Sequence, residues 1–331
     1  MPSISVIIPA YNAQDTIVET IESVLNQTFG DLEVLVIDDG SQDLTGDRVR
    51  SFDDPRVKFL PYKNGGVALA RNRGIANAKG EYISFLDHDD LWTPDKLKDQ
   101  LAALQKNDDA GVAYSWTTCM FSDENPVRYK QLDKVYFEGN VYDKILLINF
   151  IGSGSNILAR KEAIESVGGF DAAPVSNEDL DFYIRLAAKW HFALVPKHQI
   201  LYRQLNSSMS SNIRRLEQGG LVIAQKAYRD APKELQHLKK RFLYNQYIYY
   251  TNLNIENYIN SIKPISRISL KDAYRSLFKA IAFMPSALVQ MNTIEPFLKL
   301  LLISAIGSTS VKQLKKVKRR NNSSSLKKIQ S

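Results

Sequence analysis

The stretch Gly80-Glu81-Tyr82-Ile83-Ser84-Phe85-Leu86-Asp87-His88-Asp89-Asp90 decides the fold, because a short apolar run passes directly into a cluster of aspartates. The run from Tyr82 to Leu86 predicts a buried strand. Open parallel sheets bind ligands where their strands end, since loops and helix N-termini converge at that edge. Two carboxylates spaced as Asp87 and Asp89 can face one point there, and hard divalent cations prefer such oxygen ligands. The stretch therefore predicts a metal-binding edge of an α/β sheet.

Capping of the following helix is the alternative role for these aspartates. Thr93 already supplies a good N-cap, and Pro94 suits the first helical position. Three carboxylates crowded at one strand end repel each other unless a cation or hydrogen-bond donors compensate. We therefore favour the metal-binding interpretation.

The residues before this stretch alternate between strand and helix patterns, which is typical of parallel βαβ units. We expect strands at 5–9, 32–37, 57–60 and 81–86, and helices at 16–27 and 67–78. The predicted strand at 32–37 ends at Asp38-Asp39, where a carboxylate can accept hydrogen bonds from a ribose or a base. A turn is an equally good interpretation of that site, because Asp-Gly-Ser is common turn chemistry.

The residues after this stretch divide into two kinds. First come a helix starting near 93–95, strand-like residues at 112–114, a loop-rich stretch, a helix at 178–189 and strand-like residues at 195 and 200–203. Beyond about Ser211 the strand patterns disappear, and helical segments follow at 242–250, 270–284 and 293–306. We expect a catalytic domain over 1–215, a helical C-terminal region over 216–310 and a basic, partly disordered tail over 311–331, with Gly219-Gly220 as a candidate hinge.

Two further motifs offer chemistry. Glu178-Asp179 opens a predicted helix, where acidic residues stabilise the macrodipole, but Asp179 is also a candidate general base. The loop Asn64-Gly65-Gly66 leads to Arg71, which could reach a phosphate. The fingerprint G-x-G-x-x-G does not follow the first strand, where the sequence is Pro9-Ala10-Tyr11-Asn12. A dinucleotide-binding oxidoreductase and a P-loop enzyme are therefore disfavoured.

Taken in order, these segments resemble the family 2 glycosyltransferases of the GT-A fold, of the non-processive bacterial type. The match covers roughly residues 3–210, and its segments are Val6–Asn12, Ser23–Phe29, Val36–Ser41, Ala70–Gly74, Gly80–Asp90, Val167–Asp171 and Glu178-Asp179. The resemblance implies a Rossmann-like mixed sheet flanked by helices, as in nucleotide-diphospho-sugar transferases, plus a helical C-terminal region.

The resemblance also implies roles for individual residues. Asp179 would be the general base, and Asp87 and Asp89 would hold Mn²⁺ or Mg²⁺, with Asp89 the direct ligand. The residues expected at the donor nucleotide are Pro9, Tyr11, Asp39, Arg71 and Asp87. The residues expected at the sugar or acceptor are Trp92, Gly154, Ser155 and Glu178. The sequence departs from the family pattern at one position that bears on metal binding. Leu205 stands where many relatives carry a histidine.

The implied reaction moves a sugar from a nucleotide-diphosphate donor to an acceptor hydroxyl with inversion, in polysaccharide, lipopolysaccharide or glycolipid synthesis. The acceptor would be a saccharide or a lipid-linked molecule. A sugar nucleotidyltransferase is one alternative, but no glycine-rich triphosphate loop with basic partners lies near the N-terminus. A non-catalytic nucleotide- or sugar-binding protein is the other, and it would not need both a D-x-D pair and a separate base.

Charge and hydropathy bear on location. The net charge is +7. From Lys312 onward the sequence has eight basic residues, Lys312 included, and no acidic one. No segment reaches the ~20 apolar residues of a membrane-spanning helix, and one cysteine allows no intrachain disulfide. We expect a cytoplasmic protein whose apolar 293–306 segment and basic tail contact the inner face of the cell membrane. A packed helix with a solvated tail is the alternative, and nucleic acid is disfavoured because no aromatic residues interleave the basic ones.

Overall fold

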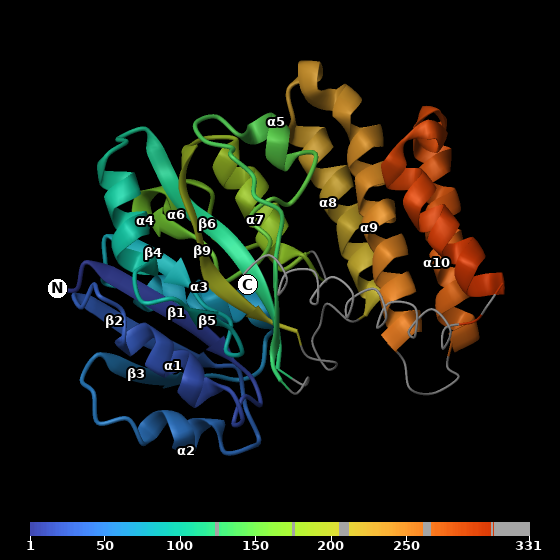
Figure 1. Cartoon of the computed structure of the whole chain (residues 1–331). Helices are drawn as coiled ribbons and strands as arrows, with labels where there is room; N and C mark the ends of the chain where they lie inside the picture. Colours follow the sequence, from blue (N-terminus) through green and yellow to red (C-terminus); the bar gives the residue numbers. More distant parts are fainter. Residues whose placement is uncertain (123–125, 174–175, 205–211, 261–265, 306, 308–331) are drawn as a thin grey trace, which may run out of the picture. The chain divides into compact units, whose positions relative to one another are not determined.

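The computed structural model describes residues 1–122, 126–173, 176–204, 212–260, 266–305 and 307. The chain divides into two compact units, each described here by itself (Figure 1). The first, called the N-terminal unit, comprises Met1–Ser211 and Gln225–Asp230. The second, called the helical unit, comprises Asn212–Ala224 and Ala231–Ser331. Leu205 and the tail at 311–331 lie outside the described residues, and the domain limits at 215 and 310 stay predictions.

A nine-stranded mixed sheet forms the centre of the N-terminal unit, as predicted, with the order β3-β2-β1-β4-β8-β6-β9-β5 and β7 paired to β6. Its strands are β1 (Ile4–Ala10), β2 (Leu32–Asp38), β3 (Val57–Pro61), β4 (Tyr82–Phe85), β5 (Leu91–Trp92), β6 (Ala110–Phe121), β7 (Arg128–Gln131), β8 (Leu158–Arg160) and β9 (His191–Arg203). Helices lie against this sheet in Figure 1. The predicted fold class is confirmed.

The parallel strands β1, β2 and β4 bring their carboxyl ends to one edge of the sheet. Ala10 pairs with Asp38 in the parallel β1–β2 ladder, and Ile7 pairs with Phe85 in the parallel β1–β4 ladder. Every residue of β1 and β2 is buried, as expected for parallel strands that are covered on both faces. The segments after Ala10, Asp38 and Phe85 therefore start close together.

The helices of the N-terminal unit follow amphipathic patterns that the sequence partly reveals. They are α1 (Ile17–Leu25), α2 (Thr45–Arg50), α3 (Val67–Asn77), α4 (Lys96–Gln105), α5 (Tyr142–Ile145), α6 (Lys161–Ser166) and α7 (Glu178–Ala187). The predicted cap of α4 is wrong, because Asp95 and not Thr93 precedes its first residue. Thr93 is held by the sheet instead: its N–H donates to the carbonyl of Gln199, and its carbonyl accepts from Gln27 Nε2.

The second half of the sheet was largely missed by the sequence analysis. The long strand β6 was visible only at 112–114, and β7 and β8 fell in the predicted loop-rich stretch. Register shifts between β6 and β9, at Ala110/Val112 and around Trp116, break the two-residue period on which strand prediction depends.

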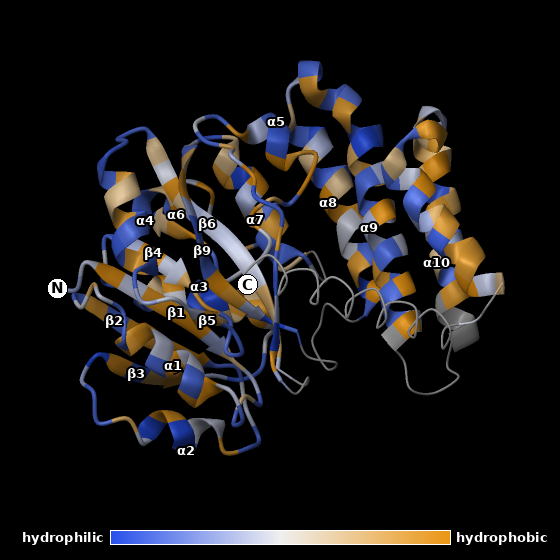
Figure 2. Cartoon of the chain, viewed as in Figure 1, coloured by the Kyte–Doolittle hydropathy of each residue, from blue (hydrophilic) through white to orange (hydrophobic). Residues whose placement is uncertain are grey.

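The helical unit contains helices only among its described residues. They are α8 (Ile213–Asp230, of which 225–230 belong to the N-terminal unit), η2 (Lys233–Leu238), α9 (Lys239–Asn260), α10 (Ser266–Phe283), η3 (Pro285–Val289) and a helix over residues 291–305. Hydrophobic and hydrophilic residues alternate along α9 and α10 in Figure 2. One buried cluster gathers Tyr244, Tyr247 and Tyr250 around Leu216, and another gathers Ile255, Leu277 and Leu300.

The predicted hinge at Gly219-Gly220 is wrong, because both glycines lie inside α8. A Cβ atom on Gly220 would come within 2.4 Å of the Tyr250 hydroxyl oxygen. That hydroxyl donates a hydrogen bond to the carbonyl of Leu216 one turn earlier. Gly220 therefore allows close approach of α9 to α8. No helix among the residues placed by the structure is long and apolar enough to cross a membrane.

Candidate functional site

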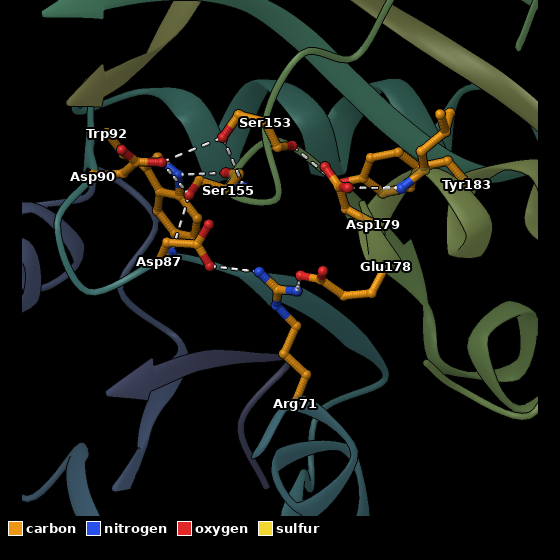
Figure 3. Close-up of polar contacts among 10 residues, drawn as sticks. Arg71, Asp87, Asp90, Trp92, Ser153, Ser155, Glu178, Asp179 and Tyr183 are labelled. Carbon is orange, nitrogen blue, oxygen red and sulfur yellow. Dashed lines mark hydrogen bonds and ion pairs between the residues drawn. The ribbon is translucent and has the colours of Figure 1, made fainter. Parts of the chain in front are cut away.

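Two groups of predicted site residues lie at the edge where β1, β2 and β4 end. We call Pro9, Tyr11 and Asp39 the β2 corner, and Asp87, Asp89, Arg71, Glu178 and Asp179 the β4 corner. Figure 3 shows much of the β4 corner, in which carboxylates from two segments, the end of β4 and the start of α7, lie on either side of Arg71 from α3.

Arg71 is the centre of the β4 corner. It lies on α3, and its guanidinium donates from Nη2 to Asp87 Oδ1 and from Nη1 to Glu178 Oε1, both at 2.6 Å (Figure 3). Burial opposes the charge, but Asp87 and Glu178 raise the pKa of Arg71 above its ordinary value. Sequence reasoning placed Arg71 near the nucleotide. The structure shows its guanidinium engaged by two carboxylates, so that it joins α3, the end of β4 and the start of α7.

Asp179, in the first turn of α7, carries a carboxyl group whose pKa is strongly raised. Burial, followed by repulsion from Glu178, raises its pKa from 3.8 to about 7, although Arg71 partly offsets this. One of its oxygens accepts a hydrogen bond of 2.8 Å from the Leu180 N–H. A carboxylate whose pKa lies near neutrality is well suited to take a proton from a hydroxyl group.

Asp89 is half-buried in the turn that follows β4. Its backbone carbonyl accepts a hydrogen bond of 2.7 Å from Arg203 Nε, which fixes the turn after β4. Burial and the nearby Asp87 raise the pKa of its carboxyl group, and no described side chain donates a hydrogen bond to it. An added cation would relieve both penalties.

A metal ion at this corner would need ligands beyond the protein. Among the described ranges, no group of three or more His, Cys, Asp or Glu side chains could hold an ion. Mg²⁺ in nucleotide sites is commonly held by one or two carboxylates together with substrate phosphates. Asp89, and Asp87 through the oxygen that does not face Arg71, fit that mode of binding.

Asp90 serves the structure rather than the ligand. Its buried carboxylate accepts hydrogen bonds from Ser155 Oγ and from Ser153 Oγ, the latter at 3.3 Å (Figure 3). It also accepts one from the Arg203 N–H at 2.9 Å. Burial and then Asp89 raise the pKa of Asp90 well above its usual value. This residue therefore ties the loop at 153–155 to the end of β4.

The predicted sugar- and acceptor-binding residues meet at the same place. Trp92 Nε1 donates to the Ser155 carbonyl at 2.8 Å, and the Asp87 N–H donates to Ser155 Oγ at 3.0 Å. A Cβ atom on Gly154 would lie 2.8 Å from Arg71 Nη2, so only glycine fits there without a shift. The structure thus brings Trp92, Gly154 and Ser155 to Arg71 and Asp87.

Sequence reasoning missed a layer of buried polar residues behind this loop. Lys96 is fully buried, donates to Ser84 Oγ at 2.5 Å and lies 3.8 Å from the centre of a Trp92 ring. Burial lowers the pKa of its amine well below the ordinary value. The sequence did contain a sign that these residues are buried, because Lys96 and Gln100 share a helical face with Leu97, Leu101 and Leu104.

The β2 corner differs in its bonding. The buried carboxylate of Asp39 accepts hydrogen bonds from the N–H groups of Gly65 and Gly66, at 2.9 and 2.8 Å, and from Arg73 Nη1 at 3.0 Å. Asp39 thereby fixes the Asn64-Gly65-Gly66 loop. Pro9 is buried in β1, whereas Tyr11 beyond it is 47% exposed.

Comparison with known proteins gives one family match and several relatives. The model of the family described as "Glycosyltransferase like family 2" matches residues 5–254. TuaG of Bacillus subtilis, whose name assigns it to teichuronic acid biosynthesis as a glycosyltransferase, is 34% identical over 221 residues, which are 64% of this chain and 82% of TuaG.

Other relatives match over shorter segments. An uncharacterized glycosyltransferase of Rickettsia felis is 40% identical over 144 residues, 43% of this chain, but the match spans only 23% of that protein. The Escherichia coli UDP-Glc:alpha-D-GlcNAc-diphosphoundecaprenol beta-1,3-glucosyltransferase WfgD is 45% identical over 105 residues, which are 31% of this chain and 42% of WfgD.

Solved structures share the fold. Staphylococcus aureus TarS 1–349 in complex with UDP-GlcNAc has a TM-score of 0.63 at 20% identity, covering 95% of this chain and 92% of that one. The mannosyltransferase PcManGT from Pyrobaculum calidifontis, in complex with GDP-Man and Mn²⁺, has a TM-score of 0.57 at 20% identity and covers 95% and 87%.

Proposed function

Because this chain belongs to the glycosyltransferase-like family 2, we propose that it transfers a sugar from a nucleotide-diphosphate donor to an acceptor hydroxyl and inverts the anomeric configuration. The observation that carries this proposal is Asp179, whose pKa of about 7 makes it a proton acceptor near neutral pH. It stands at one corner with Arg71, Glu178 and the D-x-D aspartates. A protein that only binds a ligand has no use for a base tuned in this way.

The nucleoside would bind at the β2 corner, with Tyr11 and Asp39 contacting the base and ribose beside Pro9. Asp87 of the β4 corner would complete the contacts to the nucleotide. The complexes of TarS with UDP-GlcNAc and of PcManGT with GDP-Man support a nucleotide sugar as the donor.

Mn²⁺ or Mg²⁺ would be held by Asp89, with Asp87 as second ligand, and by phosphate oxygens of the donor. When bound, the ion would supply positive charge against the diphosphate. The crowded carboxylates and the raised pKa of Asp89 support this assignment, as does Mn²⁺ in the PcManGT complex.

Asp179 would take the proton from the acceptor hydroxyl as its oxygen attacks the anomeric carbon. The bond from that carbon to the diphosphate oxygen breaks, and its electron pair leaves with the nucleoside diphosphate. Attack on the face opposite the leaving group inverts the configuration. Arg71 would hold Glu178 and Asp87 in place, while Trp92, Gly154 and Ser155 shape the pocket for the sugar and the acceptor.

The acceptor would be a saccharide or a lipid-linked molecule in polysaccharide, lipopolysaccharide or glycolipid synthesis. The names of TuaG and WfgD, one assigned to teichuronic acid and the other to a diphosphoundecaprenol-linked sugar, support this class. We place the protein in the cytoplasm, in peripheral contact with the inner face of the cell membrane.

Thermal unfolding with a panel of nucleoside diphosphates and nucleotide sugars, with and without Mn²⁺, tests the donor site. A ligand at a hundredfold excess over its Kd stabilises the protein by about 2.7 kcal/mol. We expect one nucleotide class to raise Tm in a Mn²⁺-dependent way, and Asp89→Ala to abolish the Mn²⁺ dependence. The exposed Asp95, changed to Ala, is the matched control.

The donor identified in this way then allows the product to be examined by NMR. Inversion predicts an anomeric configuration opposite to that of the donor sugar. A product that keeps the donor configuration would contradict the single displacement, and a panel without any stabilising nucleotide would contradict the donor site.

A further inference from the structure

The helical unit carries an apolar face that its own core does not cover. Large apolar side chains are exposed in η3 and in the helix over 291–305, and they are Leu288, Val289, Met291, Phe297, Leu298, Leu301 and Leu302. Val289 is 82% exposed and Met291 is 70% exposed. We call these seven residues the apolar face. Seven large exposed apolar side chains within fifteen residues exceed the scattered single ones of an ordinary soluble surface, and such a concentration often marks a site of interaction.

The helix over 291–305 is apolar on two sides. One stripe, made of Thr293, Pro296, Leu300 and Ile303, is buried, and Leu300 and Ile303 belong to a core cluster with α9 and α10. Leu298 and Leu302, four residues apart, fall on the other side together with Leu301. The helix is therefore anchored by one stripe and presents a second, unused apolar stripe.

Charge separates this part of the chain from the rest. Residues 266–331 contain 13 basic and 2 acidic residues, a net charge of +11, whereas residues 1–265 carry −4. Eight of the basic residues lie at 312–328, and the first of them comes ten residues after Leu302 in the sequence. An apolar stretch and a polybasic stretch in one part of a chain are the two signals that together give stable binding to an anionic lipid surface.

A second copy of the chain is a poorer occupant. A two-fold interface places the same surface of both copies face to face. Two C-terminal regions that each carry a net charge of +11 over residues 266–331 would then be brought together, and like charges repel. Anionic lipid headgroups would instead neutralise this charge.

We infer that the apolar face docks on an anionic membrane surface, with Leu298, Leu301 and Leu302 entering the boundary between headgroups and acyl chains. No described helix can span a bilayer, so the protein would lie on the membrane. This inference rests on the peripheral location in the proposed function and names the surface responsible. It does not depend on the transfer chemistry.

Flotation of the full chain with vesicles tests the inference. The vesicles are phosphatidylcholine alone or phosphatidylcholine mixed with phosphatidylglycerol. We expect the protein to float with the anionic vesicles only, and Leu298→Gln/Leu302→Gln to lower partitioning at least about tenfold, because two buried leucines are lost. Glutamine keeps the helix propensity of leucine close to unchanged.

Leu44→Gln is the matched control, since Leu44 is 53% exposed in the N-terminal unit. Equal flotation of the double variant and the wild type would overturn the assignment of the apolar face. Binding to neutral vesicles as strong as to anionic ones would overturn the role of charge. A wild-type dimer in light scattering that the double variant loses would identify a second copy as the occupant and overturn the proposal.

Nucleotide-dependent thermal shifts measured on the same variants keep the two proposals apart. The double variant should retain them in full, because the apolar face is outside the donor site. Lost flotation with retained shifts supports docking whatever the reaction is. Retained flotation without any shift in the wild type would contradict the donor site alone.

Discussion

The β2 corner and the β4 corner lie at the ends of strands on either side of β1, but their carboxylates are compensated in opposite ways. Asp39 at the β2 corner is buried, and both of its oxygens accept hydrogen bonds from the Gly65 and Gly66 amides, with Arg73 beside them. At the β4 corner, one arginine serves two carboxylates, Asp87 and Glu178. Asp89 and Asp179 receive no ion pair from a described side chain, and the pKa of each is raised.

This contrast indicates which carboxylates would have their charge compensated by a ligand and which are compensated by the protein. A carboxylate whose oxygens accept hydrogen bonds from backbone amides and an arginine has its charge compensated within the protein. A carboxylate with a raised pKa destabilises the fold when it is ionised, and such groups gather at functional sites. The protein thus compensates the carboxylate of the β2 corner itself, whereas at the β4 corner it leaves Asp89 and Asp179 without an ion pair from a described side chain, as the proposed cation and the proposed general base would require.

The largest effect is expected from Asp179→Asn. Loss of the base should lower kcat about 10²–10⁴-fold. The same change should raise Tm above neutral pH, because the folded pKa of about 7 lies above the unfolded value of 3.8. The carboxyl group therefore contributes stability below about pH 4 that is lost as the pH rises through about 7, and asparagine resembles the protonated form. Thermal unfolding at both ends of this pH range measures the effect.

The pH dependence of the wild-type kcat/KM supplies the second half of this test. Activity should rise with pH through an apparent pKa near 7, which is the pKa of Asp179. Asp181→Asn is a control on the same helix, and Asp181 is held by Lys226 and Arg185. A Tm of Asp179→Asn below that of the wild type at about pH 8 would contradict a raised pKa.

Arg71→Met should have the next largest effect, on stability. Removing the guanidinium leaves Asp87 and the buried Glu178 without a partner, and breaking a buried ion pair costs about 3–5 kcal/mol. Because Arg71 lowers the pKa of Asp179, its removal should also move the acidic limb of the pH–rate profile above its wild-type position. Urea unfolding and the pH profile measure the two effects.

Arg185→Met on α7 is the control for Arg71, since Arg185 pairs with Asp181 and not with the β4 corner. It should reduce stability without moving the pH–rate profile. If both variants shift the profile equally, Arg71 acts through the general stability of α7 and not through its charge at the corner.

Features formed by residues close together in the sequence could be predicted, whereas contacts between residues far apart along the chain could not. Asp87, Asp89 and the end of β4 form one local pattern, and the strands β1, β2 and β4 were predicted within one or two residues. The edge at which they end follows from parallel pairing. The bridge from Arg71 to Glu178 joins positions 107 residues apart, and nothing local to either residue indicates it.

The loop at 153–155 and its support show the same limit. Asn156 donates to the Ser115 carbonyl and accepts from the Ser115 N–H, which locks the loop to β6. Asn156 falls in the stretch predicted as loop, and β6 was hidden by its register shifts. A buried polar network of this kind depends on tertiary contacts that no hydrophobic period records.

The smallest effect is expected from Asp39→Asn, and its sign decides the comparison between the corners. Asparagine at this position would turn an amide NH₂ toward donors that now face a carboxylate, the N–H groups of Gly65 and Gly66 or the Arg73 guanidinium. Leaving such a donor without an acceptor costs about 1–3 kcal/mol. Asp39→Asn should therefore lower Tm near neutral pH, where Asp179→Asn raises it. It should also weaken nucleotide binding about tenfold, because the loop is displaced and the contact to the base is lost. Thermal unfolding with and without the stabilising nucleotide measures both. If the two substitutions changed Tm in the same direction, the corners would not differ in how their charges are compensated. The β4 corner would then have no special need for a cation.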